Sequence, residues 1–321
     1  MPAPAPSPLP ESSPFVRSIG ELRGRDVRIA GCHGASLGEL LEAGLPVAPG
    51  FVITAQALPF AMERAGVRTT LRDGLRLAPR HPLELAEVSA KLQQLVQRAG
   101  MPDELARVMV RAAVDMGAVR FAVRCSCVLD DSSYEASAPN EVRYTNVPAA
   151  EVPSVVQKCW ASQFAQGAIE AQRGGDGEPL IAVVVQRMLR CEKSGLLFTI
   201  DPNTADRTRA VVDRLSLDEV LIGARVDPNR YVMDKASNAM VSRSISRASD
   251  GWLVESDGYA EVLSHERATR VLDDDELTML TSAAQRLDTF CGAPRKVQWG
   301  FAGGKLYFLR NVPLAARAAV A

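Results

Sequence analysis

The residue types that most often carry chemistry are sparse in this chain of 321 residues and rarely stand at informative spacings. The six cysteines are scattered apart from one C-x-C pair, Cys125 and Cys127, so we expect reduced thiols and no disulfide framework. His81 and His265 lie in segments typical of solvated surface, and no Ser/His/Asp set can be identified from the sequence. Isolated side chains therefore indicate no reaction by themselves.

Two short runs have a composition suited to binding an ion, and both have a simpler structural explanation. The four acids at 273–276 precede a helical pattern, and acids at a helix N-terminus face the positive end of the helix dipole. The sequence Gly-Gly-Asp-Gly at 174–177 follows a predicted helix, whereas a phosphate loop precedes one. We therefore predict a helix start at the first run and a turn at the second.

The composition excludes several classes of protein. Lys and Arg number 37 against 38 Asp and Glu, which gives a net charge of −1 and excludes a dedicated nucleic-acid binder. With 47% apolar and 23% charged residues the chain can bury a core, and no apolar run is long enough to cross a membrane. The Pro/Ala-rich residues 1–15 are expected to form a flexible tail and not a signal peptide, so we expect a cytoplasmic protein.

Hydrophobic periodicity predicts long helices in the first half of the chain and antiparallel strands in the second. The predicted helices cover 36–43, 56–65, 84–98, 103–116, 151–173 and 274–290. The predicted strands cover 51–54, 120–124, 141–144, 180–188, 195–199, 209–213, 230–234, 240–244, 251–255, 296–299 and 305–309. Leu180–Met188 is nearly continuous apolar sequence, as in a fully buried strand. The pattern favours an α+β fold of two lobes.

Six segments that follow one another from about residue 18 to 314 carry recognisable motifs. They are GCHGASLGEL with GLPVAPGFVIT, FAVRCS, VVQRM with SGLLFTIDP, VDP with YVMDK, VQW, and LYFLR. Taken in order, these segments resemble the N-terminal nucleotide-binding domain of phosphoenolpyruvate synthases, pyruvate phosphate dikinases and rifampin phosphotransferases. The resemblance implies a two-lobed ATP-grasp fold of the pyruvate phosphate dikinase N-terminal type, with lobes at 16–185 and 186–316 and a short tail at 317–321.

The resemblance also has consequences for partners. In whole enzymes of that family, this domain phosphorylates a histidine on a separate swivelling domain. No segment here resembles the histidine domain, so the resemblance implies a protein partner that carries a phosphohistidine domain or is another phosphotransferase subunit. Neither a nucleic acid nor a membrane is expected as a partner.

The resemblance further implies which residues contact a nucleotide. The family-equivalent positions are His33, Arg124, Gln186, Glu219, Gln298 and Arg310. Arg124 matches a phosphate-binding arginine, and its guanidinium can hold a phosphate through two hydrogen bonds. His33 stands where the family has a lysine, and a neutral imidazole brings no full charge at pH 7.

The last two predicted strands differ from the family at the positions implied to hold a metal ion. An Asp-x-Glu pattern is replaced by Lys296 and Gln298, and a Gln-x-Arg pattern by Arg310 and Val312. A neutral amide is a poor ligand for Mg²⁺, and nearby cations repel it. ATP therefore stays a candidate ligand, Mg²⁺ is disfavoured, and no metal ligand is expected at Gln298 or Arg310.

A zinc site is a further alternative. In the family fold the first Gly-rich loop and the arginine strand both approach the phosphates, so Cys32, His33, Cys125 and Cys127 could lie near one another. Three cysteines and one histidine are an allowed zinc set. A C-x-C pair on a strand, however, points both thiols to one face, and this spacing is rare in structural zinc sites. The pattern therefore favours small buried hydrophobic side chains instead.

Three functions are compatible with these positions. The leading hypothesis is a stand-alone domain with a degraded nucleotide site, of phosphotransferase ancestry with weak or absent activity, which acts as a non-catalytic or regulatory partner subunit. One alternative is the active ATP-binding component of a split phosphotransferase, or a small-molecule kinase. The other is a binding protein for an anionic metabolite, anchored by Arg124 and Arg310.

Overall fold

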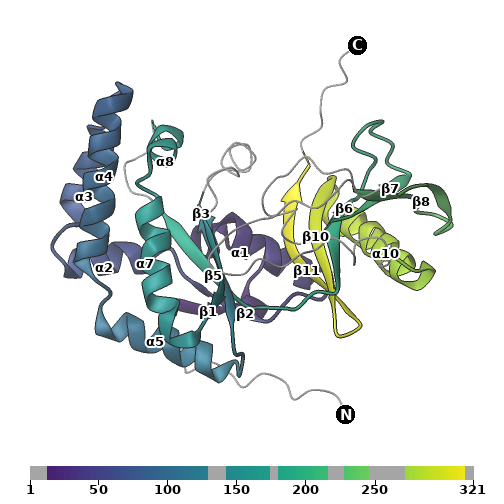
Figure 1. The fold of residues 1–321 in the computed structure, drawn as a ribbon, viewed down its shortest axis with the longest axis horizontal. Coiled ribbons are helices and arrows are strands. Elements are labelled where there is room, and N and C mark those ends of the chain that lie inside the picture. The colour runs from purple at the N-terminus through teal and green to yellow at the C-terminus, as the bar shows by residue number, and fades with distance from the viewer. Residues whose placement is uncertain (1–12, 129–141, 174–179, 216–227, 246–271, 315–321) are drawn as a thin grey trace. The chain divides into compact units, whose positions relative to one another are not determined.

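The computed structural model describes residues 13–128, 142–173, 180–215, 228–245 and 272–314 (Figure 1). These residues form two compact units, and each unit is built on one antiparallel sheet. The first unit contains the described residues within Met1–Glu42 and Val47–Leu189, and the second those within Ala43–Pro46 and Arg190–Ala321. The division expected at 185/186 falls inside strand β5 (Ile181–Arg187), and the units divide after that strand instead.

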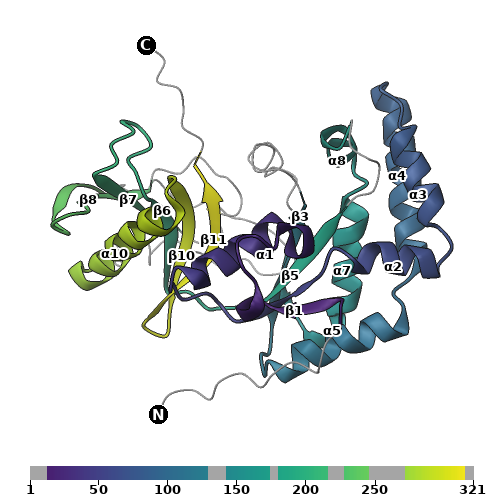
Figure 2. The ribbon, with the colours of Figure 1, turned by 180° about the vertical axis from the view of Figure 1, so that it is seen from behind.

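Strand β5 is the centre of the sheet in the first unit. The strand order is β1-β2-β5-β3-β4, in which the other strands are β1 (Val16–Ser18), β2 (Gly50–Ile53), β3 (Phe121–Cys127) and β4 (Arg143–Val147). Helix α1 (Val27–Glu42) covers one face and helix α7 (Val152–Ser162) the other, as opposite views show (Figure 1 and Figure 2). Because both faces are covered, β5 is apolar from Ile181 to Val185, which confirms the prediction of a buried strand.

Other helices of the first unit precede and follow α7 in the sequence. Those in its described ranges are α2 (Ala57–Arg64), α3 (Arg68–Arg76), α4 (Pro82–Ala99), α5 (Asp103–Asp115) and α8 (Gln166–Ala171), with the 3-10 turns η1 (Ile19–Glu21) and η3 (Ala149–Glu151). Helices α2, α4 and α5 confirm the predictions, whereas α3 is missing from them. The helix predicted over 151–173 is two helices, because the chain turns at Phe164. The Phe164 side chain lies in the core, and the Phe164 carbonyl accepts a 2.7 Å hydrogen bond from Ser89 Oγ.

The core of the first unit fills the α7 side of the sheet. Phe51, Phe121 and Val183 from the strands, Met109 from α5 and Trp160 from α7 are all fully buried. Burying a side chain of this size stabilises the fold by about 1.5–3 kcal/mol. The sheet is therefore a firm base for the polar side chains on its other face.

The sheet of the second unit has the order β11-β10-β6-β7-β8-β9. The strands are β6 (Lys193–Phe198), β7 (Arg209–Arg214), β8 (Asn229–Asp234), β9 (Met240–Ser244), β10 (Arg295–Ala302) and β11 (Lys305–Pro313). All six confirm predicted strands, with ends shifted by a few residues. The strand predicted at 251–255 lies outside the described residues.

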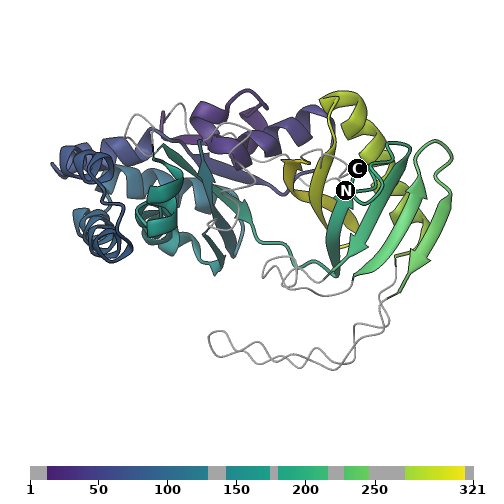
Figure 3. The ribbon, with the colours of Figure 1, turned by 90° about the horizontal axis from the view of Figure 1, so that it is seen from above.

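Helix α10 (Asp274–Cys291) covers one face of this second sheet (Figure 3). Its start confirms the helix-dipole interpretation of the acidic run. Asp273 Oδ1 accepts a 2.8 Å hydrogen bond from the Glu276 amide, and Glu276 Oε2 accepts a 2.9 Å bond from the Asp273 amide. Glu276 also pairs with Lys193 of β6 at 2.6 Å. None of the helices in the described ranges, α10 included, is long and apolar enough to cross a membrane.

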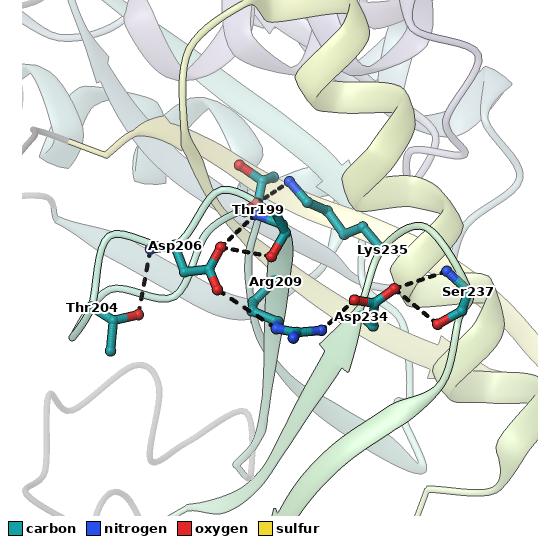
Figure 4. A network of polar contacts seen from close by, with 8 residues as sticks. Thr199, Thr204, Asp206, Arg209, Asp234, Lys235 and Ser237 are labelled. Atoms are coloured by element: carbon teal, nitrogen blue, oxygen red, sulfur yellow. Dashed lines mark hydrogen bonds and ion pairs between the residues drawn. The ribbon is translucent and has the colours of Figure 1, made fainter.

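A network of charged side chains holds the loop between β6 and β7 against the turn after β8 (Figure 4). Arg209 pairs with both Asp206 and Asp234. Asp206 Oδ1 also accepts hydrogen bonds from the Thr208 hydroxyl at 2.7 Å and amide at 2.8 Å, and Asp234 Oδ1 accepts from the Ser237 amide at 2.9 Å and hydroxyl at 2.8 Å. These hydrogen bonds favour the charged carboxylates and lower the pKa of Asp206 and Asp234.

The lowered pKa values of these carboxylates predict how the second unit responds to acid. The folded state binds these protons less tightly than the unfolded state. The network therefore stabilises the fold above the unfolded pKa of about 4, and this contribution is lost as the pH falls below it. We expect the urea concentration at the unfolding midpoint to decrease as the pH is lowered from about 4 to about 2. The decrease should be smaller in the double variant Asp206→Asn/Asp234→Asn. Urea unfolding followed by circular dichroism measures both, and identical pH profiles would contradict this role of the network.

Candidate functional site

The residues singled out from the sequence occur in both units, and each unit is described by itself. His33, Arg124 and Gln186 lie in the first unit, and Gln298 and Arg310 in the second. Glu219 lies outside the described residues.

Helix α1 is interrupted at Gly31, where φ is 67° and ψ is 173°. The first Gly-rich loop implied by the resemblance is thus a kink at Gly31 within α1, whose helical residues begin at Val27. Ser126 on β3 fixes this kink, because its hydroxyl donates to the Ala30 carbonyl at 2.7 Å and accepts from the Gly34 amide at 3.0 Å. A Cβ atom at Gly31 would lie 2.1 Å from the Ser126 carbonyl oxygen, so only glycine fits.

Arg124 and Gln186 lie on the sheet face that α1 covers. Arg124 stands two residues before Ser126 on β3 and therefore points to the same side. Gln186 on β5 is paired with Ala122, which is in phase with Arg124. Arg124 is 7% exposed and Gln186 is 4% exposed. Gln186 Nε2 donates to the Ala48 carbonyl at 3.3 Å, which fixes the amide.

His33 follows the kink on α1 and is fully buried. The structure therefore gathers His33, Arg124 and Gln186 on one side of the first sheet. Polar side chains that are this deeply buried are costly unless they are compensated, so this side of the sheet is not an ordinary core face.

The alternative in which Cys125 and Cys127 approach His33 is wrong, because β3 points these thiols to the α7 side of the sheet. Cys125 Sγ lies 3.7 Å from the Cys159 carbonyl, and Cys127 Sγ lies 3.5 Å from Gln163 Oε1. The hydrogen bond with Cys125, and then burial, raises the pKa of the Cys159 thiol well above its usual value. Cys125 and Cys127 therefore lie on the other side of the sheet from α1, while Cys32 lies with His33 on α1.

In the second unit, β10 and β11 line up the four positions at which the chain differs from the family it resembles. Lys296 is paired with Val312, and Gln298 is paired with Arg310. Side chains two residues apart on a strand point to the same face, so all four lie on one face of the sheet. We call this surface the 296/298/310 face.

Of these four side chains, Gln298 is the most buried, at 8% exposure. Its Oε1 atom has no hydrogen-bond partner within the described residues. Lys296 and Arg310 flank it and are half-buried. On strand β6, Phe198 stands opposite Lys296 and Leu196 opposite Gln298, so the neighbouring strand adds no acid.

The carboxylates that the described strands place on the 296/298/310 face already have cationic partners. Asp213 on β7 accepts hydrogen bonds of 2.7 Å from both Nε and Nη2 of Arg230. These bonds raise the pKa of Arg230, so the guanidinium stays charged. Asp234 pairs with Arg209 in the network described above. A metal ion would therefore compete with an arginine for either carboxylate.

The Mg²⁺ site implied by the resemblance does not fit these residues. Mg²⁺ takes oxygen ligands, usually with one or two carboxylates among them. Lys296, Gln298 and Arg310 offer one amide oxygen between two cations. Across the part of the chain that the structure describes, no group of three or more His, Cys, Asp or Glu side chains is placed to hold a metal ion.

The sequence as a whole matches a known family. Residues 27–319 fit the sequence model of the family described as pyruvate phosphate dikinase, AMP/ATP-binding domain. The chain belongs to this family. Membership of the pyruvate phosphate dikinase family confirms the expected ATP-grasp fold and the phosphotransferase ancestry, and it makes this an ATP-binding type of domain.

Individual relatives agree with this family. The chain is 31% identical over 319 residues to a probable phosphoenolpyruvate synthase of Methanocaldococcus jannaschii, covering 95% of this chain and 27% of that protein. For a probable phosphoenolpyruvate synthase of Methanothermobacter thermautotrophicus the identity is 30%, with 96% of this chain and 47% of that protein covered. A rifampicin phosphotransferase of a Streptomyces species is 32% identical, with 88% and 34% covered. The chain thus spans about a quarter to a half of the length of these relatives.

Two features of the site were not predicted from the sequence. The first is the bridge from Ser126 to α1, for which the spacing of Ser126 and Arg124 on a predicted strand was an available signal. The second is the pair of Asp213 and Arg230, which are 17 residues apart and meet only through the register of β7 and β8. No local pattern indicates that second pairing.

Replacing Gly31 by alanine tests the kink. We expect Gly31→Ala to destabilise the protein by about 3 kcal/mol or more, because alanine is strained at this φ and its Cβ would strike the Ser126 carbonyl. Gly66→Ala is the matched control, since Gly66 also has a positive φ but nothing lies within 4 Å of its Cβ position, and we expect a loss of about 1 kcal/mol. Urea unfolding measures both, and equal losses would mean that the Ser126 contact does not constrain the kink.

Proposed function

We propose that this chain is a pyruvate phosphate dikinase-type nucleotide-binding domain with a degraded site, which transfers no phosphoryl group and serves as a non-catalytic or regulatory subunit of a protein partner. The observation that supports this most directly is the 296/298/310 face. There, Lys296, Gln298 and Arg310 stand at the positions implied to hold or contact a metal ion.

The physical argument concerns charge. Phosphoryl transfer depends on positioning and on neutralising the charge of the moving group, and a metal ion contributes several kcal/mol of that stabilisation. Lys296 and Arg310 repel a divalent cation, and Gln298 offers it a neutral ligand. His33 stands at the position in the first Gly-rich motif where the resemblance implies a lysine, and it is buried on α1. Two sources of positive charge for the phosphates are thus lost, the metal and the lysine.

A second candidate function is supported by Arg124. This residue keeps the phosphate-binding type implied by the family and lies on the same sheet face as the α1 kink. On this alternative, the chain is the ATP-binding component of a split phosphotransferase that phosphorylates a histidine on its partner, or it is a small-molecule kinase. The names of the relatives, phosphoenolpyruvate synthase and rifampicin phosphotransferase, are compatible with either phosphotransfer. The two candidate functions differ in whether the chain turns over ATP.

Turnover of ATP separates the two candidates. We expect the full chain, incubated with ATP, Mg²⁺ and a phosphohistidine-domain protein, to release no AMP or phosphate above the protein-free rate, because the metal and the lysine charge are missing. Phosphorus NMR measures both products. A phosphoenolpyruvate synthase assayed in parallel is the positive control, and turnover within about 100-fold of it would support the split phosphotransferase instead.

Restoring two family residues is a separate test. We expect Gln298→Glu/Arg310→Gln to remain inactive in the same assay, because Lys296 still repels the metal ion and His33 still lacks the lysine charge. Thermal unfolding of the double variant shows whether it is folded. Turnover in this variant would mean that these two positions alone block catalysis, and that the rest of the site is nearly intact.

A further inference from the structure

We infer that the first unit has a binding pocket for a small hydrophobic carboxylate, formed between helices α2 and α3 and the turn at Phe164 (Figure 1). None of the residues that line it is among the family-equivalent nucleotide positions, so this inference does not rest on the proposed function. The side chains that carry the argument are Leu58, Met62, Leu71 and Phe164 on the floor of the pocket, and Arg68 and Arg72 at its mouth.

The floor of the pocket is apolar. Leu58 and Leu71 are 3% exposed, Met62 is 2% exposed and Phe164 is 1% exposed. A ligand that fills the space between them replaces water by apolar contacts, which favours binding. Counted out to its open mouth, the space is about 300 Å³, at the lower end of the range for small-molecule sites. It therefore suits a short acyl chain or a single ring.

Hydrogen bonds fix both walls of the pocket. The Val67 amide donates to the Met62 carbonyl at 3.0 Å, which sets the turn between α2 and α3. On the opposite wall, the Phe164 amide donates to the Ala161 carbonyl at 3.0 Å, and the Phe164 carbonyl accepts from Ser89 Oγ at 2.7 Å. A preformed site loses little conformational entropy when a ligand binds. Even a small ligand can therefore gain from the contacts that it makes here.

The mouth of the pocket is positively charged. Arg68 and Arg72 are four residues apart on α3, so their side chains lie on the same side of the helix. Arg68 has the Glu63 carboxylate at 3.6 Å, whereas Arg72 makes no ion pair or hydrogen bond within the described residues. A guanidinium binds a carboxylate through two parallel hydrogen bonds. An apolar body with one carboxylate thus matches both the floor and the mouth.

The charge of the head group tests this inference. Isothermal titration calorimetry of the full chain is carried out with octanoate and with octylammonium, which has the same length of chain and the opposite charge. We expect saturable binding of octanoate, at least about tenfold tighter than that of octylammonium, because the arginines attract one head group and repel the other. No saturable binding of octanoate, or equal affinities, would overturn the inference and leave the pocket a gap in the packing.

Two arginine variants locate the carboxylate. Arg72→Gln should weaken octanoate binding about fivefold, since it removes a charge-assisted hydrogen bond at a mouth that solvent partly screens. Arg98→Gln is the matched control, because Arg98 is an exposed arginine of α4 that does not line the pocket, and it should change the affinity less than about twofold. Circular dichroism confirms that both variants are folded. Equal effects of the two variants would place the carboxylate elsewhere and refute the assignment.

The apolar floor is tested separately, by NMR of protein labelled at the methionine methyl carbons. Met62→Leu and Met233→Leu, which nearly conserve volume, assign the two signals. Octanoate should shift the Met62 signal and leave that of Met233 in place, because Met233 is buried in the second unit. A Met62 signal that does not move, or that moves no more than the Met233 signal, would contradict binding in this pocket.

Discussion

The antiparallel register of β10 and β11 is the constraint on which the candidate site depends. It forces Lys296, Gln298, Arg310 and Val312 onto one face, whatever the side chains themselves would prefer. The register is held by the opposite face, where Val297 and Trp299 are fully buried. A slip by one residue would expose both of these large apolar side chains and bury the two cations, which is strongly unfavourable. Apolar burial on one side thus fixes the polar arrangement on the other.

The first unit follows the same rule with different residues. Alternation along β3 sends Cys125 into the α7 core and leaves Arg124 and Ser126 on the side of α1. Ser126 then joins the sheet to both arms of the Gly31 kink. One strand therefore separates thiols from cations and anchors a helix, and this separation is what removes the zinc alternative.

Family membership and chemistry are distinct conclusions for this chain. The matched family and the two antiparallel sheets establish an ATP-grasp fold, since a fold survives changes in its polar face as long as the core is kept. The chemistry depends instead on a few charges. The net charge of −1 for the whole chain conceals a local gain of cations at Lys296 and Arg310, because distant acids balance them in the total. For this reason the proposed function rests on the hairpin and not on the composition.

The sequence by itself determined the family, most strands and helices, and the identity of the changed positions, because these depend on local periodicity and on collinear motifs. Only the tertiary structure decided that α1 is kinked at Gly31, that Phe164 divides α7 from α8, and that Cys125 faces away from His33. It also decided that Asp213 is already paired with Arg230. Alternation tells which side chains share a face, but which partner that face meets depends on contacts between residues far apart in the chain.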